Sequence, residues 1–200
     1  MLDVIEGYSW VDQYPDLVWT VSVINGRDLG TVVREFGGDP AAQPEHLTFS
    51  QAWPAEENFG KYFYLQVIEL DDKAVTLENN GWSGDVPEIA RRLSRDGGRF
   101  VSLYWSMTGV HRITEAVDGR VRAYFDPLSV GYPISSADLV PNWAEPLGIA
   151  PEQANAACLA ILEWRTGVGF ERAWLDGAWP TYRVPDPDVM LRGVAGARVP

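Results

Sequence analysis

The sequence predicts a single α+β domain, in which a mainly antiparallel sheet of about five to seven strands packs against helices. Three observations lead to this prediction. Segments with alternating apolar residues recur along the chain, as expected for half-buried strands, and fewer segments have apolar residues at helical spacing. Short polar turns join neighbouring strand segments into hairpins. No internal repeat and no linker divides the 200 residues into two cores.

The clearest strand signal is the alternation of apolar and polar residues. In residues 17–24, Trp19 and Val21 fall on one face. Residues 99–107 alternate in the same way, which places Met107 on the apolar face. Further strands are predicted at residues 46–49, 61–70, 74–77, 111–117 and 120–125. Hairpin turns are expected at Asp71-Asp72 and, as type I′, at Asp118-Gly119.

Helices are predicted where apolar residues recur at three- and four-residue spacing. Asn25 is the expected N-cap of a helix that runs to Phe36 and ends at Gly37-Gly38. Pro151 begins the clearest helix, which continues through Arg165. Shorter or weaker helical patterns cover residues 8–14, 86–93 and 170–179.

The predicted domain spans residues 1–182. From Pro180 onward, the last 21 residues contain four prolines. Proline lacks a backbone donor and is disfavoured in helix interiors and central strands. We therefore expect residues 183–200 to form an extended, mobile tail.

Composition excludes several classes of function. The chain has 28 acidic and 16 basic residues, so its net charge of −12 repels nucleic acids and anionic membranes. A basic protein partner would complement this charge, although acidity also serves solubility. Cys158 is the sole cysteine, so no intramolecular disulfide can form. Because the sequence has no apolar leader and no long apolar run, we expect a cytoplasmic protein without membrane contact.

No set of residues has the spacing of a catalytic or cofactor motif. His46, His111 and Cys158 are scattered, whereas zinc sites draw three or four ligands from short spacings. Ser83 lies within Gly81-Trp-Ser-Gly84 but lacks the glycine two positions later that a nucleophile elbow requires. We therefore expect no metal and no cofactor, and the sequence assigns no catalytic residue.

The strongest candidate for a binding surface is the strand end and turn within residues 73–88. Glu78, Asn79 and Trp82 gather there, and tryptophan is common in binding hot spots. Glu78 falls on the face opposite Val75 and Leu77, where it either faces solvent or braces the turn through backbone hydrogen bonds. Two further candidates lie on the later strands, Tyr104 and His111. His111 is either a hydrogen-bonded strand residue or a general acid or base.

Several short segments together resemble one protein family. They are Ser9-Trp10, Gly37-Gly-Asp-Pro40, Leu77-Glu-Asn-Asn-Gly-Trp82, Arg92-Leu-Ser94, Val101-Ser-Leu-Tyr-Trp105, Asp118-Gly-Arg-Val121 and Phe125-Asp-Pro127. Over roughly residues 8–178 the chain resembles an actinobacterial family defined as a domain of unknown function, with a Leu-Glu-x-Asn-Gly-Trp strand and turn. In that pattern a proline often precedes Asn-Gly-Trp, where this chain has Asn79. The resemblance implies one domain in an actinobacterial, intracellular setting, and no activity, cofactor or catalytic residue.

Two hypotheses for function follow. The first is a non-enzymatic binding or interaction module, accessory to a toxin, defence or regulatory operon, whose acidic surface meets a basic partner. The second is a small-molecule-binding protein or enzyme with a pocket between the turn at Glu78–Trp82 and the strand end at Tyr104–His111. A pocket that joins Glu78, Trp82, Tyr104 and His111 would favour the second hypothesis.

Overall fold

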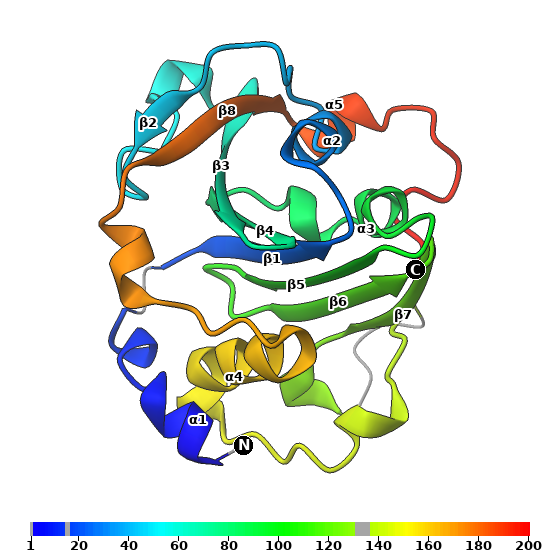
Figure 1. Ribbon diagram of the computed structural model, residues 1–200. Coiled ribbons are helices and arrows are strands. Elements are labelled where there is room, and N and C mark those ends of the chain that lie inside the picture. Colours follow the sequence, from blue (N-terminus) through cyan, green and yellow to red (C-terminus); the bar gives the residue numbers. More distant parts are fainter. Residues whose placement is uncertain (1, 15–16, 131–136) are drawn as a thin grey trace.

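The computed structural model describes residues 2–14, 17–130 and 137–200, and within these ranges eight strands form one antiparallel sheet (Figure 1). The strands are β1 (Trp19–Asn25), β2 (Glu45–Leu47), β3 (Tyr62–Leu70), β4 (Lys73–Asn79), β5 (Arg99–Trp105), β6 (His111–Val117), β7 (Arg120–Phe125) and β8 (Trp179–Pro185). Their order in the sheet is β2-β8-β3-β4-β1-β5-β6-β7. The predicted α+β class with a single antiparallel sheet is confirmed, with more strands than expected.

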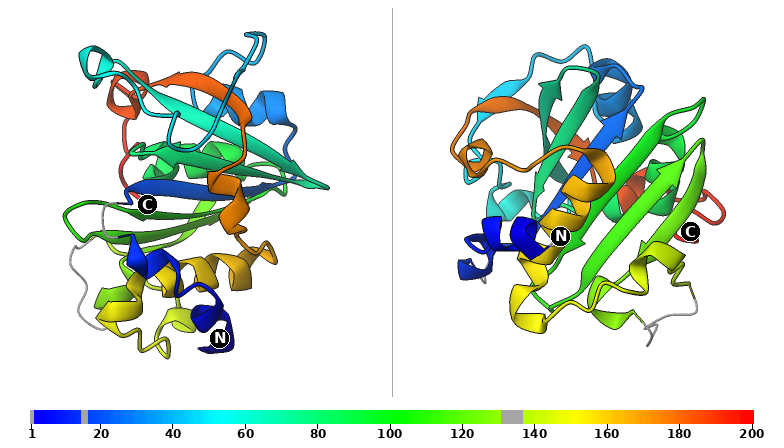
Figure 2. Two further views of the ribbon diagram at one scale, coloured as in Figure 1. Left: turned by 90° about the vertical axis from the view of Figure 1, so that its left-hand side faces the viewer. Right: turned by 60° about the horizontal axis from the view of Figure 1, so that its bottom comes forward.

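Helices pack on both faces of the sheet, as Figures 1 and 2 show. On the first face, here called the α4 face, α4 (Ala154–Thr166) lies across the strands with α1 (Leu2–Gly7) beside it. The opposite face, called the α3 face, carries α2 (Leu29–Glu35), α3 (Pro87–Leu93) and α5 (Pro187–Met190). None of the helices in the described ranges is long and apolar enough to cross a membrane.

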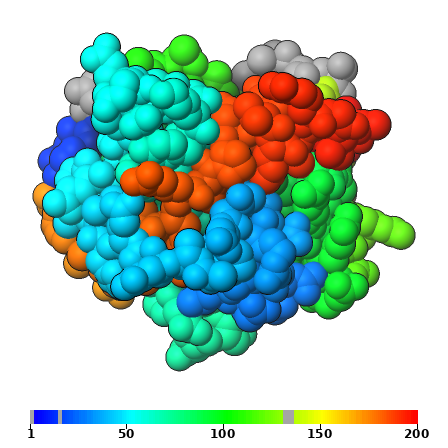
Figure 3. Space-filling view, turned by 90° about the horizontal axis from the view of Figure 1, so that it is seen from above, coloured from blue at the N-terminus to red at the C-terminus, as the bar shows by residue number. Residues whose placement is uncertain are grey.

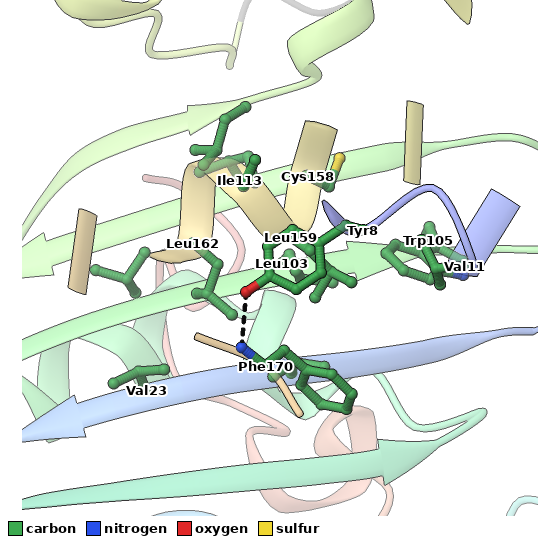
Figure 4. Packing of buried hydrophobic residues seen from close by; sticks show 14 of the residues in the cluster. Tyr8, Val11, Val23, Leu103, Trp105, Ile113, Cys158, Leu159, Leu162 and Phe170 are labelled. Atoms are coloured by element: carbon green, nitrogen blue, oxygen red, sulfur yellow. Dashed lines mark hydrogen bonds between the residues drawn. The ribbon is translucent and has the colours of Figure 1, made fainter. Parts of the chain in front are cut away.

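The α4 face carries the larger hydrophobic core (Figure 4). Leu159 and Leu162 of α4 pack with Leu103 of the sheet, because the odd-numbered residues of β1 and β5 point toward the helix. The Tyr8 hydroxyl accepts a hydrogen bond from the Phe170 amide at 2.8 Å, which ties the N-terminal segment to the chain after α4. Burial of apolar side chains is sufficient to explain which residues lie on the α4 face.

Most predicted elements are present, and the turns explain where they end. Asp118 and Gly119 both have positive φ, 50° and 73°, as the expected type I′ hairpin requires. The N-cap of α2 is Asp28, whose carboxylate accepts from the Thr31 amide, and not Asn25. Asn25 is instead the last residue of β1, since the apolar alternation continues through Ile24.

Two predicted helices are short, and one strand stops early. The helical part of residues 170–179 is only a 3₁₀ turn, Arg172–Leu175, and Trp179 already belongs to β8. The helical part of residues 8–14 is only Val11–Gln13. β5 ends at Trp105, so Met107 lies in a turn and is 80% exposed instead of facing the core. Periodicity alone does not reveal such an end, because Met107 keeps the apolar position of the pattern.

The segment from Pro180 onward is placed differently from the expected tail. β8 lies inside the sheet between β2 and β3, with Pro180 and Pro185 near its ends. Leu191 and Ala197 beyond it are buried in the core of the α3 face. Figure 3 shows β8 in orange bordered by residues of the first third of the chain, with the red C-terminal segment continuing along the same side. The predicted boundary at residue 182 therefore falls inside a strand.

Candidate functional site

The α3 face changes from apolar to polar along its strands. At one end, Ile24, Ala74, Phe100 and Ala116 pack beneath α2 and α3. Toward the other end, strand pairing aligns polar side chains in two rows across the sheet. The first row contains Thr76, Ser22, Ser102, Thr114 and Tyr124, and the second contains Glu78, Thr20, Tyr104 and Arg112. We call these nine residues the polar rows.

A short 3₁₀ helix, η3 (Ser83–Asp85), covers the polar rows and is fixed by them. The Glu78 carboxylate accepts hydrogen bonds from the Ser83 and Gly84 amides at 2.9 and 2.8 Å. The Thr20 and Ser102 hydroxyls donate to the carbonyls of Gly81 and Gly84, at 2.6 and 2.7 Å. These side-chain bonds provide hydrogen-bond partners for backbone groups of the turn that no α-helix or strand pairs.

Two glycines of the turn are required by close packing. A Cβ added at Gly84 would lie 2.4 Å from the Ser22 hydroxyl, and one at Gly81 would lie 2.7 Å from Glu78. Between the strand and η3, Asn80 takes φ of 56°, a conformation that asparagine tolerates better than most residues. Folding therefore accounts for most of the Asn-Asn-Gly-Trp-Ser-Gly sequence.

Glu78 is an unusual residue because its carboxylate is completely buried. Burial raises its pKa from 4.5 to about 7, and the two amide hydrogen bonds oppose this rise only in part. Of the two interpretations from sequence, the structure shows the bracing one.

Asp85 at the end of η3 is a second, largely buried carboxylate on the same face, with its side chain 15% exposed. Burial raises its pKa to about 7, Arg112 and Arg198 lower it, and Glu78 raises it further. The Arg112 Nε lies 3.9 Å from Asp85 Oδ1, and Arg112 Nη1 lies 3.2 Å from Asp138 Oδ1. Thr114 also lowers the pKa of Asp85 as a neighbouring hydrogen-bond donor. Among the described residues, Asp85 Oδ1, Arg112 Nε and the Thr114 hydroxyl form no hydrogen bond of good geometry. A buried carboxylate oxygen without a hydrogen-bond donor is costly for folding alone.

Aromatic rings surround this carboxylate. The Arg112 guanidinium lies over the Tyr124 ring, 4.3 Å from its centroid. Burial and the neighbouring Asp85 charge raise the pKa of Tyr104 and Tyr124, that of Tyr124 to about 12. Both phenols are therefore protonated at neutral pH and can act as hydrogen-bond donors.

An open groove of about 520 Å³ adjoins the polar rows at the strand ends. It is lined by Val18, Trp53, Phe59, Asn80, Tyr104, Ser106, Met107, Thr108 and Val110. Trp53, Phe59 and Met107 are 42%, 47% and 80% exposed. Trp53 and Phe59 pack edge to face, with centroids 5.6 Å apart. Tyr104 belongs to both the groove and the polar rows, so the two features are continuous.

The five predicted site residues lie on both faces of the sheet. Glu78 and Tyr104 lie in the second polar row, and Trp82 packs with the core of the α3 face. Asn79 points the other way, where its Nδ2 donates to the Phe49 carbonyl at 2.9 Å. His111 also faces α4, with Nε2 2.8 Å from Asn155 Oδ1. The structure thus brings Glu78 and Tyr104 onto one face and leaves His111 and Asn79 on the other.

The groove does not join the four residues of the predicted pocket, since Tyr104 alone of them lines it. It lies between Asn80 in the Glu78–Trp82 turn and residues 104–110 before β6, although Glu78, Trp82 and His111 do not line it. Within the described ranges, no three His, Cys, Asp or Glu side chains are grouped to hold a metal ion.

Sequence reasoning missed Asp85, Arg112, Tyr124 and Arg198. A signal was available for Arg112, because alternation along residues 111–117 puts it on the same face as Thr114. Tyr124 carried none, because a register shift between Glu115 and Ala116 sets it opposite Thr114, whereas a regular hairpin from Asp118-Gly119 would pair Thr114 with Ala123. Asp85 and Arg198 carry no such signal. They reach this place through the η3 turn and through the path of the C-terminal segment.

The fold and the site define an α+β protein with a buried carboxylate cluster beside an exposed aromatic groove. Residues 1–184 match the model of the family of unknown function DUF6461, and the chain belongs to this family. Neither a curated protein nor a solved structure matches the chain.

Proposed function

We propose that the protein is a non-enzymatic binding module that holds a basic protein partner in the groove beside Tyr104. The observation that carries this proposal is the exposure of Trp53, Phe59 and Met107 around one concave surface. Large apolar side chains exposed together mark interaction sites, and aromatic residues and methionine are enriched in them.

The charge of the molecule supports the basic character of the partner. The chain has a net charge of −12, and Glu56 and Glu57 stand exposed in a 3₁₀ turn between Trp53 and Phe59. Acidic residues beside an apolar anchor steer a positively charged partner and fix its orientation. On the sequence resemblance we further propose an actinobacterial, cytoplasmic setting. As a setting for such a binding module, we also propose a role accessory to a toxin, defence or regulatory operon.

The groove is tested with Trp53→Ala and Met107→Ala against the matched control Trp164→Ala. Trp164 is 50% exposed on α4 and does not line this groove. A partner captured from the native host is purified, and its affinity is measured for each variant. We expect the groove variants to weaken binding about 30-fold, the effect of a hot spot of about 2 kcal/mol. Equal losses in Trp164→Ala, or none in the groove variants, would refute the site.

The role of charge is tested by Glu56→Lys with Glu57→Lys. The matched control is Asp71→Lys with Asp72→Lys, at the β3–β4 turn beyond the other end of β4. We expect the first pair to slow association and to flatten its salt dependence, and the second pair to change both much less. An association rate that is insensitive to salt would contradict a basic partner.

A second candidate function is small-molecule binding or catalysis at the same place. It is favoured by Tyr104, which lines the groove while its phenol lies in the electrostatic field of the buried Asp85. A small ligand that reached Asp85 would raise the melting temperature of the wild type but not of Asp85→Asn. Trp53→Ala would leave that stabilisation intact, whereas it should weaken the binding of a protein partner about 30-fold.

A further inference from the structure

The C-terminal segment places one arginine against the candidate site. The Arg198 guanidinium lies over the Trp82 ring, 3.9 Å from its centroid, and is close enough to Asp85 to lower the pKa of that carboxyl. An aromatic face combined with a nearby carboxylate is the usual recognition site for a guanidinium, which is planar and can stack while it forms charged hydrogen bonds.

We propose that Trp82 and Asp85 form a binding site for a guanidinium group, that Arg198 occupies it in the unbound protein, and that an arginine of a partner replaces Arg198. The inference rests on the proposed function for its partner, and it specifies that partner as one that presents an arginine. The site itself is defined by residues of this chain alone.

Arg198 is only loosely held at the proposed site. Its guanidinium is 47% exposed and forms its ion pair with Asp188, which is itself 71% exposed. Asp85 Oδ1 accepts no hydrogen bond within the described part of the chain. Arg198 therefore supplies stacking over Trp82 and positive charge from the surface side, whereas the donors that face Asp85 from inside the protein are Arg112 and Thr114.

The charges around Asp85 favour an additional cation. Asp85 and Asp138 both face the guanidinium of Arg112, and Glu78 adds a further buried carboxyl nearby. Arg112 and, from the surface side, Arg198 both lower the pKa of Asp85 by their positive charge. A ligand cation that entered while Arg198 left would preserve this balance.

The C-terminal segment is held in a way that permits exchange. Arg91 donates to the carbonyls of Gly196 and Val199, at 2.8 and 2.6 Å, and the Glu88 amide donates to the Ala197 carbonyl at 3.1 Å. These bonds hold the backbone on α3 and are independent of the Arg198 side chain. A tethered side chain competes at an effective concentration in the millimolar range, so it weakens external arginine without abolishing binding.

The test measures binding of N-acetyl-arginine amide to the full chain by tryptophan fluorescence and by the indole N–H signals in NMR spectra. We expect Arg198→Ala to bind this probe at least tenfold more tightly than the wild type. The matched control is Arg192→Ala, an exposed arginine of the same segment that forms none of the ring contacts. N-acetyl-citrulline amide, which has the same shape without the charge, should not bind.

Two further variants keep the test decisive if one of them fails to fold. The first adds Asp85→Asn to Arg198→Ala, and the second adds Trp82→Phe to it. Relative to Arg198→Ala alone, each double variant should bind the arginine probe at least fivefold more weakly, while its circular dichroism spectrum stays unchanged. Equal affinity of wild type and Arg198→Ala, or equal binding of the citrulline probe, would overturn the inference.

The results separate this inference from the proposed function. If Trp53→Ala weakens partner binding as expected but Arg198→Ala does not change the affinity for arginine, the groove is supported as a docking surface and the guanidinium site is refuted. If arginine binds as expected but the groove variants bind the partner with unchanged affinity, the guanidinium site is supported and the proposed docking surface is refuted.

Discussion

Alternate residues of β1 belong to two different environments. Trp19, Val21 and Val23 face α4 in a continuous apolar core, whereas Thr20 and Ser22 point to the opposite face beneath η3. Both sets are completely or almost completely buried. Burial of the first set stabilises the fold directly, whereas burial of a hydroxyl costs free energy unless a hydrogen bond replaces those to water. Thr20 has such a bond, to the Gly81 carbonyl, and Ser22 has none among the described residues. The α4 face is thus explained by folding, and the polar rows are where a function beyond folding should be sought.

The largest expected effect lies on the α4 face. Trp19 is completely buried and packs against Trp105 and Phe170, with centroid distances of 4.9 Å to each, and against Phe49 at 5.7 Å. We expect Trp19→Ala to lower the free energy of unfolding by about 3–5 kcal/mol, the range for a large aromatic in a core. Urea denaturation measures this. If Trp19→Ala lowers the free energy of unfolding less than Gly84→Ala does, the proposed contrast between the two faces is wrong.

The second prediction concerns pH and the polar end of the α3 face. Because burial raises the pKa of Glu78 from 4.5 to about 7, the folded state binds more protons than the unfolded state between these values. Stability from this group is complete below pH 4.5 and is lost as pH rises to about 7. The full shift from 4.5 to about 7 corresponds to about 3 kcal/mol.

The measurement compares urea denaturation from about pH 5.5 to about pH 8, a range in which ordinary carboxylates are already ionised. The wild type should lose stability with rising pH, and Glu78→Gln should show a distinctly smaller loss because its amide does not titrate. The same slope in both proteins would show that Glu78 is not responsible. A stability that rises with pH would contradict the direction of the pKa shift.

The contrast between the faces also marks what the sequence could reveal. Alternation predicted β1 and β5, and it placed Glu78 opposite Val75 and Leu77, which the structure confirms. The strand order could not be predicted, because it depends on pairings such as β3 with β8 that join residues more than a hundred positions apart.

The candidate site was predictable only in part for the same reason. Glu78 and Tyr104 both pair with Thr20, a relation that appears once β1 is known to lie between β4 and β5. The sequence makes His111 a candidate because it is the histidine expected within the sheet, but the β5–β6 register pairs it with Trp105 on the α4 face. Arg198 lies in a segment whose prolines predicted an extended tail, and its place depends on bonds from α3.

The third prediction tests how tightly η3 fits the polar rows. In Gly84→Ala the new Cβ would lie 2.4 Å from the Ser22 hydroxyl and 2.7 Å from Thr20 Cγ2, both on buried strand residues. We expect a loss of about 1–3 kcal/mol, typical of overpacking. Adding Ser22→Ala should recover part of it. Gly7→Ala serves as the control, since nothing lies within 4 Å of its added Cβ. If Gly7→Ala lowers the free energy of unfolding as much as Gly84→Ala does, a steric clash at Gly84 is not the cause.

The smallest expected effect distinguishes two serines that face each other across β1 and β5. The Ser102 hydroxyl donates to the Gly84 carbonyl at 2.7 Å, whereas the equally buried Ser22 hydroxyl has no hydrogen-bond partner among the described residues. We expect Ser102→Ala to lower the free energy of unfolding by about 1 kcal/mol and Ser22→Ala to leave it unchanged or slightly raised. Urea denaturation of both variants at one pH tests this. If Ser22→Ala proves the more costly of the two, its hydroxyl takes part in a bond that supports the polar rows, and the folding explanation would then extend to that residue.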